Sequence, residues 1–358
     1  RQSVFFYLEK QTLYKRTRNQ TQCFSMKKKH LFFCVFISIL KLTNAQAYHW
    51  DQSVYSILDL VMKQEYDSAF KICNLKIKAD SMDIDSRYLK LVTMQSQLAD
   101  YESYSLEGPR CISMAESLIT FLDETISDSN STEDKEKADF LKGNIYGILS
   151  IIKAKRGSIL SCIRDARLSY DHFKRLKKSP YFLPDVLYGL GLFDYYIGDN
   201  LKWIPGVGKR ARSGLDMLYT ASKSDSPFRY GAINSLAWIL IERGNFGEAD
   251  SIASEVLQKY PGNTLFLQVK SRAAFGTKQY RHAIELAKQL ISFSLKRDVI
   301  NWSDVLSGYQ LIASCYIKLG NKKKAQEIAS EGLSYQISDD TLRIEWVQKH
   351  RNFLMSIK

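Results

Sequence analysis

The chain has 358 residues, of which 45% are hydrophobic and 25% are charged, a composition typical of a folded soluble protein. Its formal net charge is +13, but residues 1–47 hold nine Lys or Arg and one acidic residue. The remainder carries 42 basic and 37 acidic residues, a net of +5, which is a normal solubility charge. The composition therefore gives no support for nucleic acid as a partner.

Residues 26–47 have the three parts of a secretory signal peptide. A basic start follows Met26, the run Leu31–Leu40 is apolar except for Ser38, and Ala45-Gln-Ala47 ends the segment. A run of ten residues is too short for a helix to span a bilayer core of about 30 Å, which takes about 20 residues. We therefore predict export to the periplasm or cell exterior, with cleavage after Ala47 and no membrane span in the mature chain. The alternative, a buried N-terminal helix, is disfavoured because the run shows no amphipathic pattern.

Residues 1–25 precede this segment and are basic, with no clear period. They do not begin with a start residue. We interpret them as a non-native upstream segment, or a disordered one, ahead of a start at Met26.

Residues 48–226 show apolar residues at helical spacing, interrupted by short polar or glycine-containing turns. The predicted helices of this region span 53–62, 66–77, 86–101, 109–126, 138–155, 158–176, 184–197 and 211–222. Residues 127–137 are small and polar and are expected to form a surface loop that runs into the N-cap of the next helix, near Thr132 or Asp134. Gly198-Asp-Asn200 is expected to end the seventh helix. No strand-like alternation of useful length occurs, so the predicted fold class is all-α.

Residues 230–261 carry the clearest pattern in the chain. A first helical face is followed by a glycine turn, a second amphipathic run containing Ala253, and a final proline. The stretch resembles a tetratricopeptide repeat of the bacterial exported type, and the matching positions are Leu236-Ala237, Leu240, Gly244, Phe246, Ala249 and Pro261.

The unit recurs twice in the region 227–358. Phe246 and Ala249 are followed, 34 residues later, by Tyr280 and Ala283, and a third unit repeats the spacing as far as Ala325. Ala325 lies 42 residues beyond Ala283, and we expect the excess of eight to lengthen the second helix or its loop through 291–301. Because one hairpin cannot bury its own apolar face, such units must stack. The resemblance therefore implies an α-solenoid, with roughly seven hairpins in all and a capping helix over 341–355.

The first helices of stacked hairpins line a groove. The predicted groove residues on these helices are Asn234, Trp238, Gln268, Arg272, Gln310 and Ser314. Asn and Gln can bind the backbone of an extended peptide, Arg272 a carboxylate, and Trp238 an apolar side chain. The alternative is that these residues face water or a neighbouring helix. On the first interpretation the protein is a binding scaffold with a protein or peptide partner.

The segment 181–218 imitates two nucleotide-binding motifs. Gly189-x-Gly191 lacks a preceding strand, and Gly206–Arg210 lacks the first glycine and the hydroxyl residue of a phosphate loop, so no nucleotide cofactor is expected. Close helix packing explains the glycines instead. Residues 150–218 are also similar to the mitochondrial outer-membrane helical-repeat family and its bacterial relatives. That resemblance implies a repeat scaffold without catalytic residues.

Aromatic and basic residues crowd the same segment and suggest an alternative function as a small-molecule or solute carrier. The residues of this alternative pocket, within 181–212, are Tyr188, Tyr195, Trp203 and Arg210. Rings at helical spacing more often fill the space between helices, and the basic side chains could equally lie on an exposed loop. An enclosed pocket would favour the carrier, and a continuous open groove would favour the scaffold.

The residues that carry catalysis or bind metals are scattered. Four cysteines remain after export, Cys73, Cys111, Cys162 and Cys315, with no zinc-binding spacing. They are either buried thiols or, in an oxidising compartment, members of disulfides that spacing cannot assign. The histidines form no His-Glu-x-x-His motif, and no Gly-x-Ser-x-Gly occurs. We therefore predict a non-enzymatic protein with no cofactor and no metal.

Overall fold

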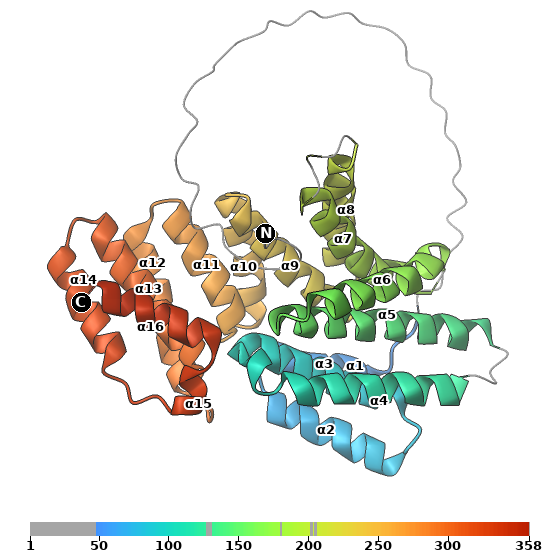
Figure 1. The fold of residues 1–358 in the computed structure, drawn as a ribbon. Helices are drawn as coiled ribbons and strands as arrows, with labels where there is room; N and C mark the ends of the chain where they lie inside the picture. Colours follow the sequence, from blue (N-terminus) through green and yellow to red (C-terminus); the bar gives the residue numbers. More distant parts are fainter. Residues whose placement is uncertain (1–47, 127–130, 180, 201–202, 204–205, 358) are drawn as a thin grey trace, which may run out of the picture.

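The computed structural model describes residues 48–126, 131–179, 181–200, 203 and 206–357. Within these ranges the regular structure is entirely helical (Figure 1). The first eight α-helices are α1 (Gln52–Met62), α2 (Tyr66–Ala79), α3 (Ile84–Tyr101), α4 (Gly108–Ile126), α5 (Thr132–Lys155), α6 (Ile159–Arg175), α7 (Leu183–Asn200) and α8 (Gly208–Ser222). The others are α9 (Arg229–Glu242), α10 (Phe246–Lys259), α11 (Thr264–Gly276), α12 (Tyr280–Leu295), α13 (Trp302–Lys318), α14 (Lys322–Leu333), α15 (Asp339–Leu342) and α16 (Glu345–Ile357). Two short 3-10 helices, η1 (Ser103–Ser105) and η2 (Leu176–Lys178), complete the set.

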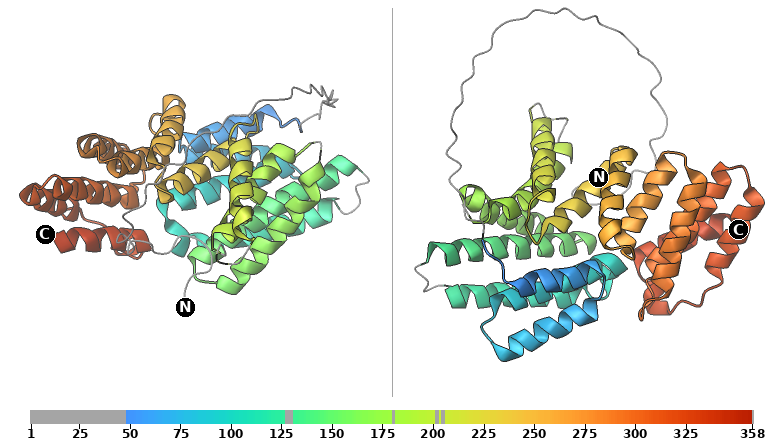
Figure 2. Two further views of the ribbon diagram at one scale, coloured as in Figure 1. Left: turned by 90° about the horizontal axis from the view of Figure 1, so that it is seen from above. Right: turned by 180° about the vertical axis from the view of Figure 1, so that it is seen from behind.

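In the described part of the chain, α1 to α14 pack as seven consecutive hairpins, and α16 packs on α13 and α14 as a cap. The predicted fold class, a solenoid of helical hairpins, is therefore confirmed. Each hairpin buries one face against the next, so the apolar core is continuous from pair to pair. The direction of the helices changes sharply between α6 and α7, so the stack is not a straight rod (Figures 1 and 2).

Two differences from the predicted boundaries have a local reason. Helix α5 begins at Thr132, close to the N-cap expected near Thr132 or Asp134 and before residue 138, because Ser131 caps it by accepting a hydrogen bond from the Asp134 backbone N–H at 3.3 Å. Residues 127–130 lie outside the described residues. Helix α7 continues through Gly198 to Asn200, because this glycine is a packing contact: a Cβ there would lie 2.1 Å from the Ala211 nitrogen.

The hairpins α9–α10, α11–α12 and α13–α14 share one turn geometry. The residue between the two helices is left-handed in each, with φ of 77° at Gly244, 63° at Lys278 and 77° at Gly320. Small residues that face the partner helix are fully buried, including Ala249 and Ala283 at 0% exposure. The predicted repeat unit is therefore present in all three pairs.

The N-terminal hairpin returns to contact the C-terminal repeats and closes one side of the superhelix. Near the end of α1, the Tyr260 hydroxyl donates to Asp59 at 2.8 Å and the Asn263 amide donates to the Met62 carbonyl at 2.8 Å. Beside them, the Thr264 backbone N–H donates to the Gln64 side chain at 3.0 Å. These partners lie about 200 residues apart in sequence, and we call this junction the seam.

The seam continues at Asp100, near the end of α3. Its carboxylate accepts hydrogen bonds from the Tyr66 hydroxyl at 2.8 Å and from Arg297 Nη2 at 2.7 Å. The Asn301 amide donates to the Asp100 carbonyl at 2.9 Å. Arg297 and Asn301 belong to the connection after α12, a helix of 16 residues, so the predicted excess of eight residues supplies the groups that hold α3.

Candidate functional site

A cavity of about 290 Å³ lies on the concave side of the superhelix. As predicted for stacked hairpins, the first helix of each of the first six pairs contributes to its wall: α1, α3, α5, α7, α9 and α11. The wall is mainly apolar and carries the rings of Phe140, Phe173 and Phe228. A few polar side chains interrupt it, which is the usual composition of a ligand-binding cavity. We call this space the inner cavity, and its polar lining residues include Gln95, Asn144, Asp185, Tyr188 and Asn234.

Asn234 is the predicted groove residue that lines the inner cavity. Its Oδ1 atom is buried and has no hydrogen-bond partner among the described residues. A buried acceptor without a partner costs about 1–3 kcal/mol, so a ligand with an N–H or O–H group here would recover a hydrogen bond. On the facing helix α7, the Tyr188 hydroxyl lies 3.4 Å from the hydroxyl of the neighbouring Ser235.

Asp185, in the first turn of α7, adds an ionisable group to the same wall. The side chain is 8% exposed, and its carboxylate accepts a short hydrogen bond from the Ser226 hydroxyl. Burial raises the pKa of Asp185 to about 6, in opposition to the Ser226 hydrogen bond. The inner cavity therefore contains a carboxyl group that changes charge just below neutral pH.

Three further predicted groove residues contact the neighbouring first helix. The Arg272 guanidinium lies over the Trp238 ring at 5.6 Å, and its Nη2 donates to the Ser307 hydroxyl at 3.4 Å. The Gln268 amide donates a short hydrogen bond to the buried carboxylate of Asp304. These three side chains therefore contact a neighbouring helix, which was the alternative to an open groove, and each remains half-buried.

The last two predicted groove residues lie on α13 beneath the cap. The Gln310 Oε1 atom lies 2.5 Å from Nδ1 of His350 on α16, and Ser314 is half-buried on the same helix. Burial, together with the charges of Arg272 and Lys349, lowers the pKa of His350 to about 3. His350 is therefore neutral at neutral pH, and the hydrogen on its Nδ1 is donated to Gln310.

The four residues of the alternative pocket are not brought together. Tyr188 faces the inner cavity, but Tyr195 is buried among Leu218 and Ile239. Trp203 is 76% exposed, and Arg210 forms an ion pair with Asp194. The four side chains therefore do not line one enclosed pocket. Tyr188 and Tyr195 lie about two turns apart along α7, Trp203 lies in the connection after it, and Arg210 lies on α8.

Gly189 and Gly191, which resemble part of a dinucleotide-binding motif, are packing residues, as the prediction of close helix packing held. A Cβ on Gly189 would lie 2.1 Å from the Phe173 ring. A Cβ on Gly191 would lie 2.9 Å from the backbone oxygen of Gly214 on α8. The missing side chains let α7 approach both α6 and α8 closely, and they are not needed for a phosphate.

The four cysteines among the described residues are free and buried, which is the first of the two alternatives left open by the spacing. Burial raises the pKa of each thiol, to about 11 for Cys73 and to about 12 for Cys111 and Cys315. The described residues contain no group of three or more metal-binding side chains. None of the helices described is both long enough and apolar enough to cross a bilayer.

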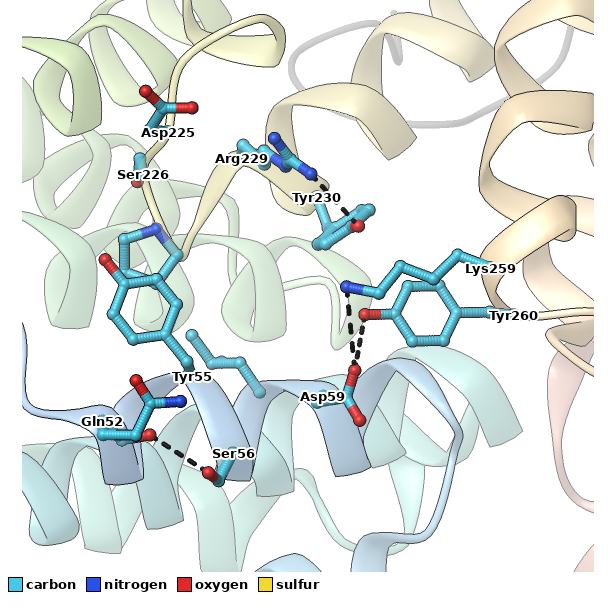
Figure 3. A pocket seen from close by; sticks show the side chains of 12 residues that line it. Gln52, Tyr55, Ser56, Asp59, Asp225, Ser226, Arg229, Tyr230, Lys259 and Tyr260 are labelled. Carbon is cyan, nitrogen blue, oxygen red and sulfur yellow. Dashed lines mark hydrogen bonds and ion pairs between the residues drawn. The ribbon is translucent and has the colours of Figure 1, made fainter.

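A second cavity, of about 450 Å³, opens where α1 meets the start of α9 and the end of α10 (Figure 3). Its most prominent side chains are Tyr55 and Asp59 from α1, Arg229 and Tyr230 from α9, and Lys259 and Tyr260 from the end of α10. Sequence reasoning missed this cleft, because its two sides are about 200 residues apart and neither side carries a motif. We call it the seam cleft.

No protein-family model matches the sequence, and no curated protein matches it. Solved structures with a similar helical arrangement are tetratricopeptide repeat proteins. The C-terminal part of a TPR repeat-containing protein from Cytophaga hutchinsonii is 14% identical, covering 81% of this chain and 99% of that one, with a TM-score of 0.35. A tetratricopeptide repeat protein from Parabacteroides merdae is 13% identical, covering 85% and 99%, with a TM-score of 0.37. Yeast Tom70 is 11% identical, covering 85% and 88%, with a TM-score of 0.29.

These similarities concern the helical architecture alone. The repeat assignment depends on the chain's own geometry, namely the left-handed turns and buried alanines of α9 to α14. Those three hairpins have the tetratricopeptide form. The described part of the chain is a solenoid of helical hairpins.

Proposed function

We propose that this protein is an exported, non-enzymatic scaffold that binds a segment of a partner protein on the inner face of its superhelix. The observation that carries the proposal is the inner cavity, to whose wall the first helices of six successive hairpins contribute, together with the second helices α2 and α6. A wall built in this way follows the curve of the stack, which suits a linear segment of chain. Its apolar surface would hold the side chains of that segment.

The polar residues of the inner cavity support a peptide as the occupant. A peptide backbone that enters an apolar cavity must find hydrogen-bond partners, because an unpaired amide is costly to bury. Asn234 offers an acceptor that has no partner among the described residues, and Gln95 and Asn144 add amide groups on the facing helices α3 and α5. These groups would position the backbone of the segment, while the rings would select its side chains.

The test begins with affinity capture of the mature protein from its own cells, with the partner read by mass spectrometry. The Asn234→Ala variant removes the acceptor in the cavity, and Asn352→Ala is the matched control, because Asn352 is exposed on the outer cap helix α16. We expect Asn234→Ala to weaken binding of the purified partner about tenfold, the effect of one buried hydrogen bond. Equal binding by both variants would contradict a role for the inner cavity.

A second candidate function is a carrier of a small apolar molecule. Its support is the volume of the inner cavity, about 290 Å³, which is near the lower end for small-molecule sites. Native mass spectrometry of the purified protein separates the two functions. A bound compound of defined mass that fills the cavity would favour the carrier, whereas a cavity free of any compound would favour the scaffold.

Export is the part of the proposal that rests on residues 26–47, which lie outside the described residues. It is tested by the N-terminus of the protein recovered from its own cells. We expect Tyr48 as the first residue, in a periplasmic or secreted fraction. An N-terminus at or before Met26 in a cytosolic fraction would contradict export.

A further inference from the structure

The seam cleft combines cations with aromatic faces around an open centre (Figure 3). Arg229 Nη2 lies 3.5 Å from the Tyr230 hydroxyl. The Lys259 ammonium lies 5.0 Å from the centroid of the Tyr260 ring and 5.8 Å from that of Tyr230. Tyr55 faces them from α1 and is 39% exposed, so its ring is open to a ligand.

The charges in the seam cleft do not cancel at its centre. Asp59 is compensated by its own neighbours, because Lys63 pairs with it at 2.8 Å and the Tyr260 hydroxyl donates to it at 2.8 Å. Lys259 also pairs with Asp59, at 3.9 Å, and its side chain stays 58% exposed (Figure 3). Asp225 is exposed on the rim and acts on Arg229 through solvent, with no ion pair between the two within the described residues. Asp59 is therefore shared by two lysines, and Arg229 faces the open space without a carboxylate partner among the described residues.

Tyr230 gives a second indication of positive charge beside Arg229. Burial by itself raises the pKa of its phenol, yet hydrogen bonds with Arg229 and Tyr260 and the charge of Lys259 together hold that pKa below its ordinary value. The neighbouring Tyr260 shifts the opposite way, because burial and its hydrogen bond to Asp59 raise its pKa. An anion is therefore favoured on the Arg229 side of the cleft and disfavoured beside Asp59.

We propose that the seam cleft binds a small organic anion, a carboxylate joined to an aromatic or apolar body. The carboxylate contacts Arg229 and Lys259, which supply charge-assisted hydrogen bonds. The body packs against the rings of Tyr55, Tyr230 and Tyr260. This site goes beyond the partner-binding role of the inner cavity and does not depend on it.

Binding in the seam cleft also strengthens the closure of the superhelix. The ligand contacts α1 on one side and α9 and α10 on the other, so it joins the same elements as the seam. Because a ligand that binds only the folded, closed arrangement stabilises it by mass action, saturating ligand should raise the free energy of unfolding. Tyr230, Leu58 and Pro227 line both the seam cleft and the inner cavity, so the two spaces share part of one wall.

The test uses phenylacetate as the probe, with calorimetric titration of the full mature chain. Phenylacetamide keeps the ring without the charge, and acetate keeps the charge without the ring. We expect both to bind at least about tenfold more weakly than phenylacetate, because each lacks one of the two interactions. Equal affinity for phenylacetamide would overturn recognition of the anion, and equal affinity for acetate would overturn recognition of the body.

Variants locate the site. The double variant Arg229→Gln/Lys259→Gln should lose phenylacetate binding at least about tenfold, whereas Arg229→Lys/Lys259→Arg, which keeps both charges, should stay within about threefold. Lys323→Gln removes one positive charge on the distant helix α14 and should leave the affinity unchanged. Unchanged binding in the Gln double variant, with the fold verified by circular dichroism, would overturn the assignment, and so would the absence of phenylacetate binding to the unsubstituted chain.

A further probe distinguishes two sources of the same chemistry. N-acetyl-phenylalanine carries its carboxylate as a chain terminus does. Tighter binding of this compound than of phenylacetate would assign the cleft to the C-terminus of a peptide, and weaker binding would assign it to a free aromatic acid. Both results support a carboxylate site, and neither bears on the inner cavity.

Discussion

Arg297 Nη2 donates to the Asp100 carboxylate at 2.7 Å, and this ion pair joins two points of the chain that are 197 residues apart. The Asp100 side chain is fully buried, and that of Arg297 is 14% exposed. Buried pairs contribute little net stability relative to an apolar pair, but removing one partner strands the other charge. The pair therefore fixes where the N-terminal hairpin docks on the repeats.

Asp100→Ala should destabilise the fold strongly. The substitution leaves the Arg297 charge and the Tyr66 hydroxyl without their shared acceptor, and the expected loss is about 3–5 kcal/mol in the free energy of unfolding. Urea unfolding followed by circular dichroism measures this loss. The control is Asp340→Ala, which breaks an exposed pair with Arg343 at 3.1 Å and should cost at most about 1 kcal/mol. Similar losses in the two variants would show that the seam contributes nothing special.

A second prediction concerns pH. The folded state raises the pKa of Asp185 to about 6 from an ordinary value of 3.8, so between these values the folded protein binds more protons than the unfolded one. Its contribution to stability is therefore present at low pH and is lost as pH rises through about 6. Asp185→Asn keeps the shape and removes the titration. Relative to the variant, the unsubstituted protein should lose roughly 2–3 kcal/mol between about pH 4 and about pH 7.

The measurement is a set of urea unfolding curves for both proteins across that pH range. Other groups titrate in both proteins and cancel in the difference. A difference that stays constant with pH would show that Asp185 is not held in a buried, desolvated site.

The third prediction tests the close packing of α7 against α8. A Cβ on Gly214 would lie 2.3 Å from the Tyr195 nitrogen, and backbone atoms cannot move aside cheaply. Gly214→Ala should therefore destabilise the protein by about 1–3 kcal/mol. Gly247→Ala is the matched control on α10, because a Cβ there meets no atom within 4 Å. It should be neutral or stabilising by up to about 1 kcal/mol, since alanine favours the helix. Thermal unfolding distinguishes opposite signs directly.

Features that depend on contacts within one hairpin could be predicted from the sequence, whereas features that depend on contacts between distant parts of the chain could not. Gly244 and Ala249 belong to one hairpin, so their spacing along the sequence indicated the repeat. The longer spacing from Ala283 to Ala325 located the connection after α12, whose residues hold α3. The seam cleft pairs Asp59 with Tyr260 across 201 residues, and no local pattern marks either one. Trp203 lies in the connection between α7 and α8 and is 76% exposed, and the sequence does not show that it leaves the helix that carries Tyr188 and Tyr195. Of the predicted groove residues, Asn234 lines the inner cavity, whereas Gln268 and Arg272 contact the next first helix, because helix spacing gives the face of a residue and not its neighbour.

The last prediction concerns the cysteines. Cys73, Cys111, Cys162 and Cys315 are free and have essentially no exposed surface, and burial raises the pKa of each thiol. Since thiolates are the reactive form, an aromatic disulfide reagent should label none of them rapidly in the native protein and all four once urea unfolds it. Intact-mass measurement after alkylation under non-reducing, denaturing conditions gives the count. Two or four thiols missing from that count would reveal disulfides and contradict the buried, unpaired arrangement. A full count in protein recovered from the periplasm would mean that burial alone protects these thiols in an oxidising compartment.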